Sequence, residues 1–347
     1  MKKILIHIPG SEQDTLFDAA ARDGCHDPFI YLRDRLRVLG YQLVSGSIRS
    51  TEGCARVLFV DAVGMAGPPR SWRIVARSAT NSLFGRRQLL ERWQIYEKYI
   101  RVGWRDRLVL FLWEAPAFCP QNSDPKVHEQ FPVVFTWNDN YVDGKTFHKF
   151  LLPTTGRFPE VPDVPFHRRK LLVNITCNKT VSHPRELYSA RREAIRYFEQ
   201  HDPEDWDLYG VGWNQSGTER DFFPSYRGTV SHKWDVFPQY RFGLCYENIR
   251  DEPGYITEKI FDCMRAGCVP IYWGASNVER YVDRGAFIDR REFKSNVDLG
   301  DFLLSMSEHE WTQYRAAIKT YLRSARFAAF LPEAFADNII QVLTLSG

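Results

Sequence analysis

The stretch from Phe242 to Gly274, FGLCYENIRDEPGYITEKIFDCMRAGCVPIYWG, constrains the fold of this chain more than any other part of it. It opens with an apolar run at 242–246, which is typical of a buried strand. A polar loop containing a proline and a glycine follows over 247–255. Thr257 can then cap a short helix that stops at a glycine, and a second apolar strand occupies 269–273. This order predicts one strand–loop–helix–strand unit of an open α/β sheet.

The start of the predicted helix is a candidate anion site. Ligands of open α/β sheets bind beyond the carboxyl ends of the strands, against helix N-termini. Lys259 lies in the first turn, where the helix dipole favours acids, and a cation there suggests a phosphate or diphosphate nearby. Glu247, Asn248 and Glu258 crowd the same edge and could bind sugar hydroxyls. An ordinary capped helix with a solvated lysine explains the spacing equally well.

The same stretch resembles the donor-binding motif of the α-1,3/1,4-fucosyltransferases, glycosyltransferase family 10. The chain supplies FGLCYEN, YITEK and AGCVPIYWG in the family's order, with Tyr246 for the usual Phe and Ile249 for the usual Ser. The resemblance implies an inverting, metal-independent transfer of L-fucose from GDP-fucose to a glycan hydroxyl. It also implies a GT-B architecture, in which two Rossmann-like doubly wound domains face a cleft. Tyr255 joins the expected contacts to the donor nucleotide or sugar.

The N-terminal part of the chain predicts a second doubly wound unit. A short strand at 4–8 is followed by helical spacing of apolar residues over 29–39. Further apolar strands follow at 41–44 and 57–60. We therefore expect two domains of the same kind.

A segment with four prolines, 150–169, is read as the linker between them. The expected domains are 1–165 on the acceptor side and 166–347 for the GDP-sugar. A terminal helix is expected at 332–345, and its apolar face can return to the first domain.

Glu114 is the candidate general base. It follows an apolar strand at 108–112, in Trp113-Glu114-Ala115-Pro116. Partial desolvation between apolar neighbours would raise its pKa and suit it to take a proton, whereas a solvated loop carboxylate would not act in this way. The segment resembles the family's Phe-Glu-Ser-Pro-like stretch, whose Glu is the proposed base, although only Glu and Pro match. Should Glu114 be structural, the base is to be sought among Glu247, Glu258 and Asp139.

Arg191 is the candidate for a second phosphate contact. The family carries R-x-x-x-[VIY]-x-x-L before a Tyr-Gly pair, and Arg191, Ile195 and Phe198 fit that spacing within a helix expected at 184–200. The resemblance implies that this arginine contacts the donor diphosphate. Arg192 takes its place if the register slips by one, and an ordinary surface arginine is the alternative.

The stretch 68–107 is basic, with ten Lys or Arg against three acids. Leu89, Trp93, Tyr96 and Ile100 make one helical face, which usually packs on a core. The sharper alternative is contact with anionic lipid or a lipid-linked acceptor. The net charge of only +3 does not suggest a nucleic-acid binder.

Cysteine usage and hydropathy bear on the compartment. The seven cysteines form no CxxC pair and are interpreted as reduced thiols. No signal peptide or membrane-length apolar stretch is evident. The chain therefore resembles a soluble, bacterial-type family member, expected in the cytoplasm, with the inner membrane as a peripheral contact through 68–107.

Several alternatives stay open. A retaining transferase of the same architecture carries E-P-x-G and a second Glu eight residues on, but Glu258 follows Glu252 by only six. Asp205 and Asp207 have the letters of a metal-binding pair but do not end a strand, and no HExxH occurs, so no metal and no cofactor are expected. A different nucleotide sugar remains open, as does a non-catalytic carbohydrate-binding relative.

Overall fold

The computed structural model describes residues 1–9, 15–46, 53–65, 86–214 and 222–345. The chain divides into two compact units. The first unit comprises Met1–Gly156, Val181–His183 and Leu331–Gly347, and the second comprises Arg157–Thr180 and Pro184–Phe330. The terminal segment thus belongs to the first unit.

The first unit is built on a six-stranded parallel sheet in the order β2-β1-β3-β4-β5-β6. Its strands are β1 Lys2–His7, β2 Tyr41–Ser45, β3 Cys54–Val60, β4 Leu108–Leu112, β5 Val133–Thr136 and β6 Phe147–Lys149. β1 pairs with β2 on one side and with β3 on the other, so the winding direction reverses between β1 and β3. Such a reversal defines a doubly wound sheet.

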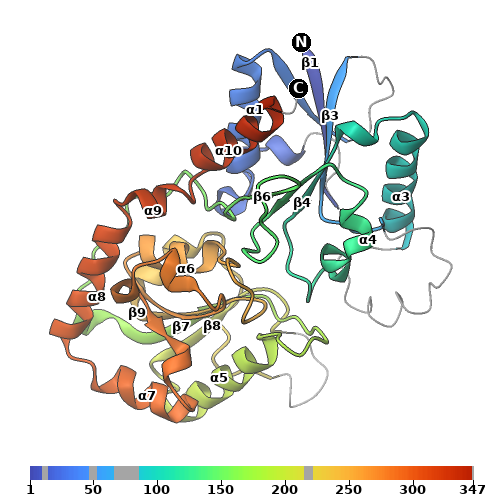
Figure 1. The fold of residues 1–347 in the computed structure, drawn as a ribbon. Coiled ribbons are helices and arrows are strands. Elements are labelled where there is room, and N and C mark those ends of the chain that lie inside the picture. The colour runs from blue at the N-terminus through green and yellow to red at the C-terminus, as the bar shows by residue number, and fades with distance from the viewer. Residues whose placement is uncertain (10–14, 47–52, 66–85, 215–221, 346–347) are drawn as a thin grey trace. The chain divides into compact units, whose positions relative to one another are not determined.

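Helices of the first unit pack on this sheet (Figure 1). They are α1 Asp27–Val38, α3 Arg86–Arg101, α4 Pro125–His128 and α10 Pro332–Leu345. α1 and α10 lie side by side, so the terminal helix packs beside the start of the chain. None of the described helices combines the length and the apolar character that crossing a membrane requires.

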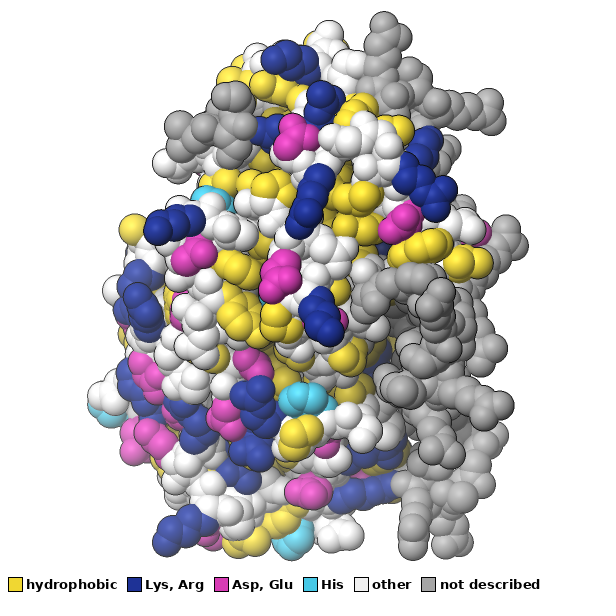
Figure 2. Space-filling view, turned by 45° about the vertical axis from the view of Figure 1, so that its right-hand side comes forward, with side chains coloured by type: hydrophobic (Ala, Val, Ile, Leu, Met, Phe, Trp, Pro, Cys, Tyr) yellow, Lys and Arg dark blue, Asp and Glu magenta, His cyan; other side chains and the backbone are white. Residues whose placement is uncertain are grey.

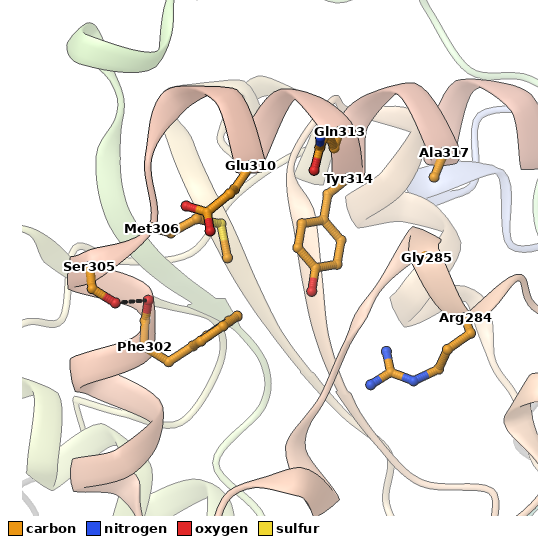
Figure 3. A pocket seen from close by; sticks show the side chains of 9 residues that line it. All are labelled: Arg284, Gly285, Phe302, Ser305, Met306, Glu310, Gln313, Tyr314 and Ala317. Carbon is orange, nitrogen blue, oxygen red and sulfur yellow. Dashed lines mark hydrogen bonds between the residues drawn. The ribbon is translucent and has the colours of Figure 1, made fainter.

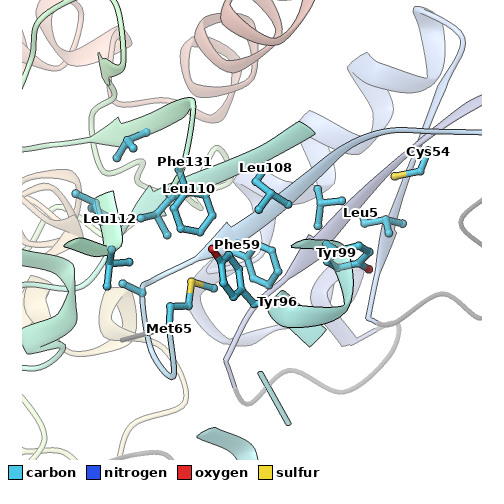
Figure 4. Packing of buried hydrophobic residues seen from close by; sticks show 14 residues of the cluster. Leu5, Cys54, Phe59, Met65, Tyr96, Tyr99, Leu108, Leu110, Leu112 and Phe131 are labelled. Atoms are coloured by element: carbon cyan, nitrogen blue, oxygen red, sulfur yellow. The ribbon is translucent and has the colours of Figure 1, made fainter. Parts of the chain in front are cut away.

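The face that α3 buries agrees with the predicted one only in part. Tyr96 and Tyr99 pack around Phe59 in the core of the first unit (Figure 4), and Arg92 is buried beside them. Trp93 and Ile100 are only partly buried, and the side chain of Leu89 lies outside the described residues. The predicted stripe is therefore confirmed in part, since Tyr96 lies in the core and Ile100 packs against it, while Arg92 and Tyr99 occupy inward positions that were not predicted.

The second unit has a five-stranded parallel sheet in the order β11-β10-β9-β7-β8. Its strands are β7 Lys170–Ile175, β8 Trp206–Tyr209, β9 Tyr240–Tyr246, β10 Val269–Trp273 and β11 Ile288–Asp289. Its helices are α5 Tyr188–His201, α6 Glu258–Arg265, α7 Asn296–Ser305, α8 Glu308–Tyr321 and α9 Ala325–Ala328. The winding reverses between β7 and β9, so this sheet is doubly wound as well and the predicted fold class is confirmed.

Helix α5 begins four residues later than the sequence predicted. Glu186 pairs with Ile249 in an isolated antiparallel bridge, and its carboxylate accepts the N–H groups of Tyr188 and Ser189. The segment from Pro184 is therefore held against the loop after β9 and not wound into the helix.

Candidate active site

Glu247 is the first residue beyond β9, and its side chain has no exposed surface. One carboxylate oxygen accepts the N–H of Thr257 at 2.8 Å, and the other accepts the Thr257 hydroxyl at 2.8 Å and the Lys259 ammonium at 3.1 Å. Gly274 makes room for it, since a Cβ there would lie 2.5 Å from Cγ of Glu247. Glu247 therefore holds the start of α6 through hydrogen bonds to Thr257 and Lys259. Its carboxylate does not face solvent as a sugar-binding group would.

Thr257 is the N-cap of α6, as predicted, and its hydroxyl accepts the backbone N–H of Lys259. The Lys259 ammonium donates to the same hydroxyl at 2.9 Å, and its side chain is 23% exposed. Burial alone would lower the pKa of Lys259, but the carboxylates of Glu247 and Glu258 outweigh it and raise the pKa. A charged ammonium thus lies at a helix N-terminus, where the helix dipole also favours anions.

Glu258 lies between two ammonium groups and keeps 45% of its side chain exposed. Its carboxylate is 3.9 Å from Lys259 and 3.6 Å from Lys233. Burial would raise its pKa, but the two lysines outweigh burial and hold the pKa at about 2. Glu258 is therefore an ionised, accessible acceptor of hydrogen bonds.

Lys233 is a component of this cluster that sequence reasoning missed. It lies in a 3₁₀ turn, η7 (Lys233–Asp235), ahead of β9 and also binds Asp262 of α6 at 2.6 Å. No sequence motif includes Lys233. The only signal in the sequence was Asp262, an acid on α6 that could pair with a cation.

Arg191 is buried, with 3% exposure, at the point where the strand order reverses. Its guanidinium donates to the hydroxyl of Thr176, the first residue beyond β7, at 2.9 Å. It also donates to the carbonyl of Tyr246, the last residue of β9, at 2.8 Å and to that of Glu247 at 3.1 Å. Burial lowers its pKa. Arg191 thus clamps the carboxyl ends of β7 and β9, the edge at which ligands of such sheets bind.

Arg192 is partly exposed and donates to the side-chain oxygen of Asn178, also beyond β7, at 2.5 Å. Both arginines therefore reach the edge that the sequence predicted, and the more accessible of the two is Arg192.

Asn248 and Tyr255, the other predicted donor contacts, lie in the loop between Glu247 and α6. Asn248 is half-buried, and its backbone carbonyl accepts the N–H of Leu187. Tyr255 is buried, and its carbonyl accepts the Tyr272 hydroxyl at 3.2 Å. The backbone carbonyls of the loop are therefore bound by the segment preceding α5 and by a side chain of β10.

Glu114 follows β4 at the carboxyl edge of the sheet of the first unit and is half-buried. Its backbone N–H donates to Asp61 at 2.8 Å, and its carbonyl accepts from Asn122 at 2.8 Å. Asp139, an alternative base, is held by the Lys149 ammonium at 2.7 Å.

Asp207 is not arranged as a metal ligand. It lies within β8, and its carboxylate accepts from Lys170 at 2.8 Å, Tyr240 at 2.7 Å and Arg227 at 2.5 Å. Burial would raise its pKa, but these donors outweigh burial and lower it. Among the residues that the structure describes, no three His, Cys, Asp or Glu side chains are grouped as a metal site would need.

A separate pocket of about 630 Å³ lies at the opposite edge of the second sheet (Figure 3). It is lined by the 3₁₀ turn η10 (Arg284–Ala286), α7 and α8, with the Tyr314 ring directed into it. Because η10 immediately precedes β11, the pocket is at the amino-terminal edge of the sheet. None of the predicted site residues lines it.

The chain is similar to known proteins in sequence and in fold. Residues 168–324 match the sequence model of "Glycosyltransferase family 10 (fucosyltransferase) C-term". The chain is 33% identical over 81 residues to "Alpha-(1,3)-fucosyltransferase FucT" of Helicobacter pylori, covering 23% of this chain and 17% of that one. It is 27% identical over 198 residues to "4-galactosyl-N-acetylglucosaminide 3-alpha-L-fucosyltransferase 9" of Bos taurus, covering 56% and 48%.

Solved structures share the fold. A crystal structure of α1,3-fucosyltransferase with GDP-fucose has a TM-score of 0.56 at 13% identity, covering 99% of this chain and 91% of that one. An α-glucosyltransferase with UDP-glucose and DNA has a TM-score of 0.54 at 10% identity, with 99% of both chains covered.

The two doubly wound sheets and these neighbours define the class as a GT-B glycosyltransferase fold. Within that class, residues 168–324 match the family 10 fucosyltransferase domain, and this stretch contains the Glu247–Thr257–Lys259 cluster. The chain spans less than half the length of the curated relatives named above.

Proposed function

We propose that the chain transfers L-fucose from GDP-fucose to a hydroxyl of a glycan acceptor. The observation that carries the proposal is the Lys259 ammonium at the N-terminus of α6, held by buried Glu247 inside a family 10 domain. A helix N-terminus combined with a fixed cation suits a diphosphate. The related α1,3-fucosyltransferase fold has been solved with GDP-fucose, which supports the choice of donor.

The second unit would hold the donor. As the bond between the anomeric carbon and the diphosphate breaks, negative charge builds on the leaving GDP. Lys259, the α6 amides and Arg191 or Arg192 stabilise that charge. Glu258 and Asn248 supply acceptors and donors for sugar or ribose hydroxyls, and Tyr255 shapes the loop between them.

The first unit would supply the base. Glu114 takes the proton of the acceptor hydroxyl as its oxygen attacks the anomeric carbon from the side opposite the diphosphate. The configuration at that carbon is then inverted, and no covalent sugar–enzyme intermediate forms. The acceptor hydroxyl belongs to an N-acetylglucosamine or glucose unit of a glycan.

The proposed reaction needs no metal, because lysine, arginine and helix amides carry the charge of the leaving group. Nucleic acid is not a proposed partner: on the face drawn in Figure 2, basic and acidic side chains are interspersed among the described residues. Location in the cytoplasm, with peripheral contact to anionic lipid or a lipid-linked acceptor through 68–107, stays a prediction. Residues 66–85 lie outside the described residues, and Arg92 is buried, so Arg92 does not contribute to such a contact.

The experiment is release of nucleotide from a panel of GDP- and UDP-sugars, with and without oligosaccharide acceptors, in excess chelator. We expect acceptor-dependent release of GDP from GDP-fucose, and Lys259→Met should abolish most of it. Lys319→Met, at an exposed position of α8, is the matched control and should retain full activity. Binding of GDP-fucose without turnover on any acceptor would favour a non-catalytic carbohydrate-binding protein, and turnover of another nucleotide sugar would refute the donor.

A further inference from the structure

Asp61 belongs to a buried hydrogen-bond network that includes the backbone of Glu114. It is the first residue after β3 and is 4% exposed. Its φ of 59° lies in the left-handed region, which residues other than glycine seldom adopt, although aspartate tolerates this conformation better than most residues. Its backbone N–H donates to the Phe111 carbonyl at 2.7 Å and so extends the pairing of β3 with β4. This turn directs the Asp61 carboxylate toward the loop that follows β4.

One oxygen of that carboxylate accepts three hydrogen bonds. The donors are the backbone N–H of Trp113 at 2.9 Å, the backbone N–H of Glu114 at 2.8 Å and the Asn122 amide at 2.7 Å. A buried carboxylate is stable only when such donors compensate for its lost hydration. The Asp61 carboxylate at the end of β3 is therefore bound directly to the backbone N–H of Glu114, the candidate base.

Asn122, in the 3₁₀ turn η4 (Pro120–Ser123), completes the support. The nitrogen that donates to Asp61 also donates to the Glu114 carbonyl at 2.8 Å. Its side-chain oxygen accepts the N–H of Ala62 at 2.8 Å. Both backbone polar groups of Glu114 are thus bound to side chains of this network.

Arg92 of α3 holds the other side of the same turn. Its guanidinium, 6% exposed, donates to the backbone carbonyls of Val60 at 2.8 Å, Asp61 at 2.7 Å and Val63 at 3.1 Å. Arginine remains charged when buried, so it also compensates the charge of Asp61. Arg92 thus holds the backbone of the turn at Asp61, while the Asp61 carboxylate holds the backbone of Trp113 and Glu114.

A buried ionic network is weak support for stability alone, because apolar residues of similar volume commonly serve as well. Here two side chains converge on the backbone of one residue at the carboxyl edge of the sheet. We propose that Asp61 and Asn122 are positioning residues that set the orientation of the Glu114 carboxylate, with Arg92 holding the Asp61 turn. The inference rests on the base role of Glu114 proposed above.

The test is a double-mutant cycle on transfer rate. Asp61→Asn tolerates the left-handed turn and keeps one acceptor oxygen, but it loses the charge that binds three donors at once. We expect kcat to fall about 10- to 10²-fold, the range that small misplacements of a catalytic group cause, with KM for GDP-fucose unchanged. The acid limb of the pH–rate profile should shift, because the environment of the Glu114 carboxylate changes. In a Glu114→Gln background, Asp61→Asn should lower the residual rate little further, since it acts through Glu114.

The matched control is Asp143→Asn. Asp143 likewise accepts three backbone N–H groups of its own loop, from Lys145, Thr146 and Phe147, and none of these bonds involves Glu114. A folded Asp61→Asn enzyme with the kcat and pH profile of this control would overturn the inference, as would additive effects in the cycle. Asn122→Ala, taken through the same cycle, carries the test if Asp61→Asn does not fold.

Two failures are distinguishable. An unchanged transfer rate in Glu114→Gln refutes the base role itself and the positioning role with it. A large loss in Glu114→Gln beside normal kcat in Asp61→Asn and Asn122→Ala refutes only the positioning role.

Discussion

Replacing Lys259 by methionine separates its place in the fold from its place in the proposed reaction. The substitution keeps much of the apolar stem and removes the ammonium 3.1 Å from Glu247. It leaves the Glu247 carboxylate, which has no exposed surface, with the two hydrogen bonds from Thr257. Removing one partner of a fully buried ion pair costs about 3–5 kcal/mol of stability. Lys259 is still 23% exposed, so we expect the low end, about 3 kcal/mol.

The companion variant is Lys259→Met with Glu247→Gln. Glutamine keeps one acceptor oxygen for the Thr257 N–H, and its amide nitrogen can donate to the Thr257 hydroxyl oxygen. No charge is left buried, so most of the lost stability should return. Transfer should not return, because the cation that stabilises the leaving diphosphate is still absent. We expect about 10²- to 10³-fold lower kcat in both variants, the range found for preorganised electrostatic donors.

The assays are urea unfolding followed by circular dichroism and steady-state transfer with GDP-fucose. A double variant that recovers both stability and transfer would refute the diphosphate role, because Lys259 would then serve only to neutralise Glu247. Near-normal turnover in a folded single variant would refute it as well.

Three further predictions follow from the same residues. Transfer should persist in excess chelator, and loss of activity that Mn²⁺ or Mg²⁺ restores would contradict the metal-independent reading. Glu114→Gln should keep GDP-fucose affinity by calorimetry while transfer falls by about 10²- to 10⁴-fold and loses its acid limb; weakened donor binding with an intact limb would make Glu114 structural. The pKa of Glu258 is about 2 against an unperturbed 4.5, so its contribution to stability is present above pH 4.5 and is lost as the pH falls through 2. The stability of Glu258→Gln should accordingly depend less on pH between 4.5 and 2 than that of the wild type. If the urea unfolding midpoints of both proteins change equally with pH, the pairing with Lys233 and Lys259 is contradicted.

Local patterns in the sequence were enough to predict the second sheet. Thr257 caps α6 and β9 and β10 flank it where the apolar runs indicated, because each element depends on neighbours within a few positions. The start of α5 was predicted too early, because Glu186 is drawn into a bridge with Ile249, a partner far along the chain. Propensity cannot report such a contact.

The roles within the site were harder to predict than its location. Glu247 was expected to face a sugar because it ends a strand beside a helix N-terminus. Its carboxylate instead turns inward, since Gly274 leaves the space and Thr257 and Lys259 offer three donors. Thr257, Lys259 and Gly274 lie ten, twelve and twenty-seven positions after Glu247. Neither helical nor strand periodicity predicts that residues at these separations meet.

Arg92 shows the same limit from the opposite direction. An arginine in a basic amphipathic segment reads as a surface residue, and the sequence contains nothing near it that demands a buried cation. The demand comes from the left-handed turn at Asp61, which presents several carbonyls to α3. A positive φ at an aspartate is not visible in composition or periodicity. Two buried charged residues thus serve one turn: Arg92 binds its carbonyls, and the Asp61 carboxylate binds the backbone of Glu114. Burying both charges and a strained backbone at this point is best explained if the position of the Glu114 carboxylate matters.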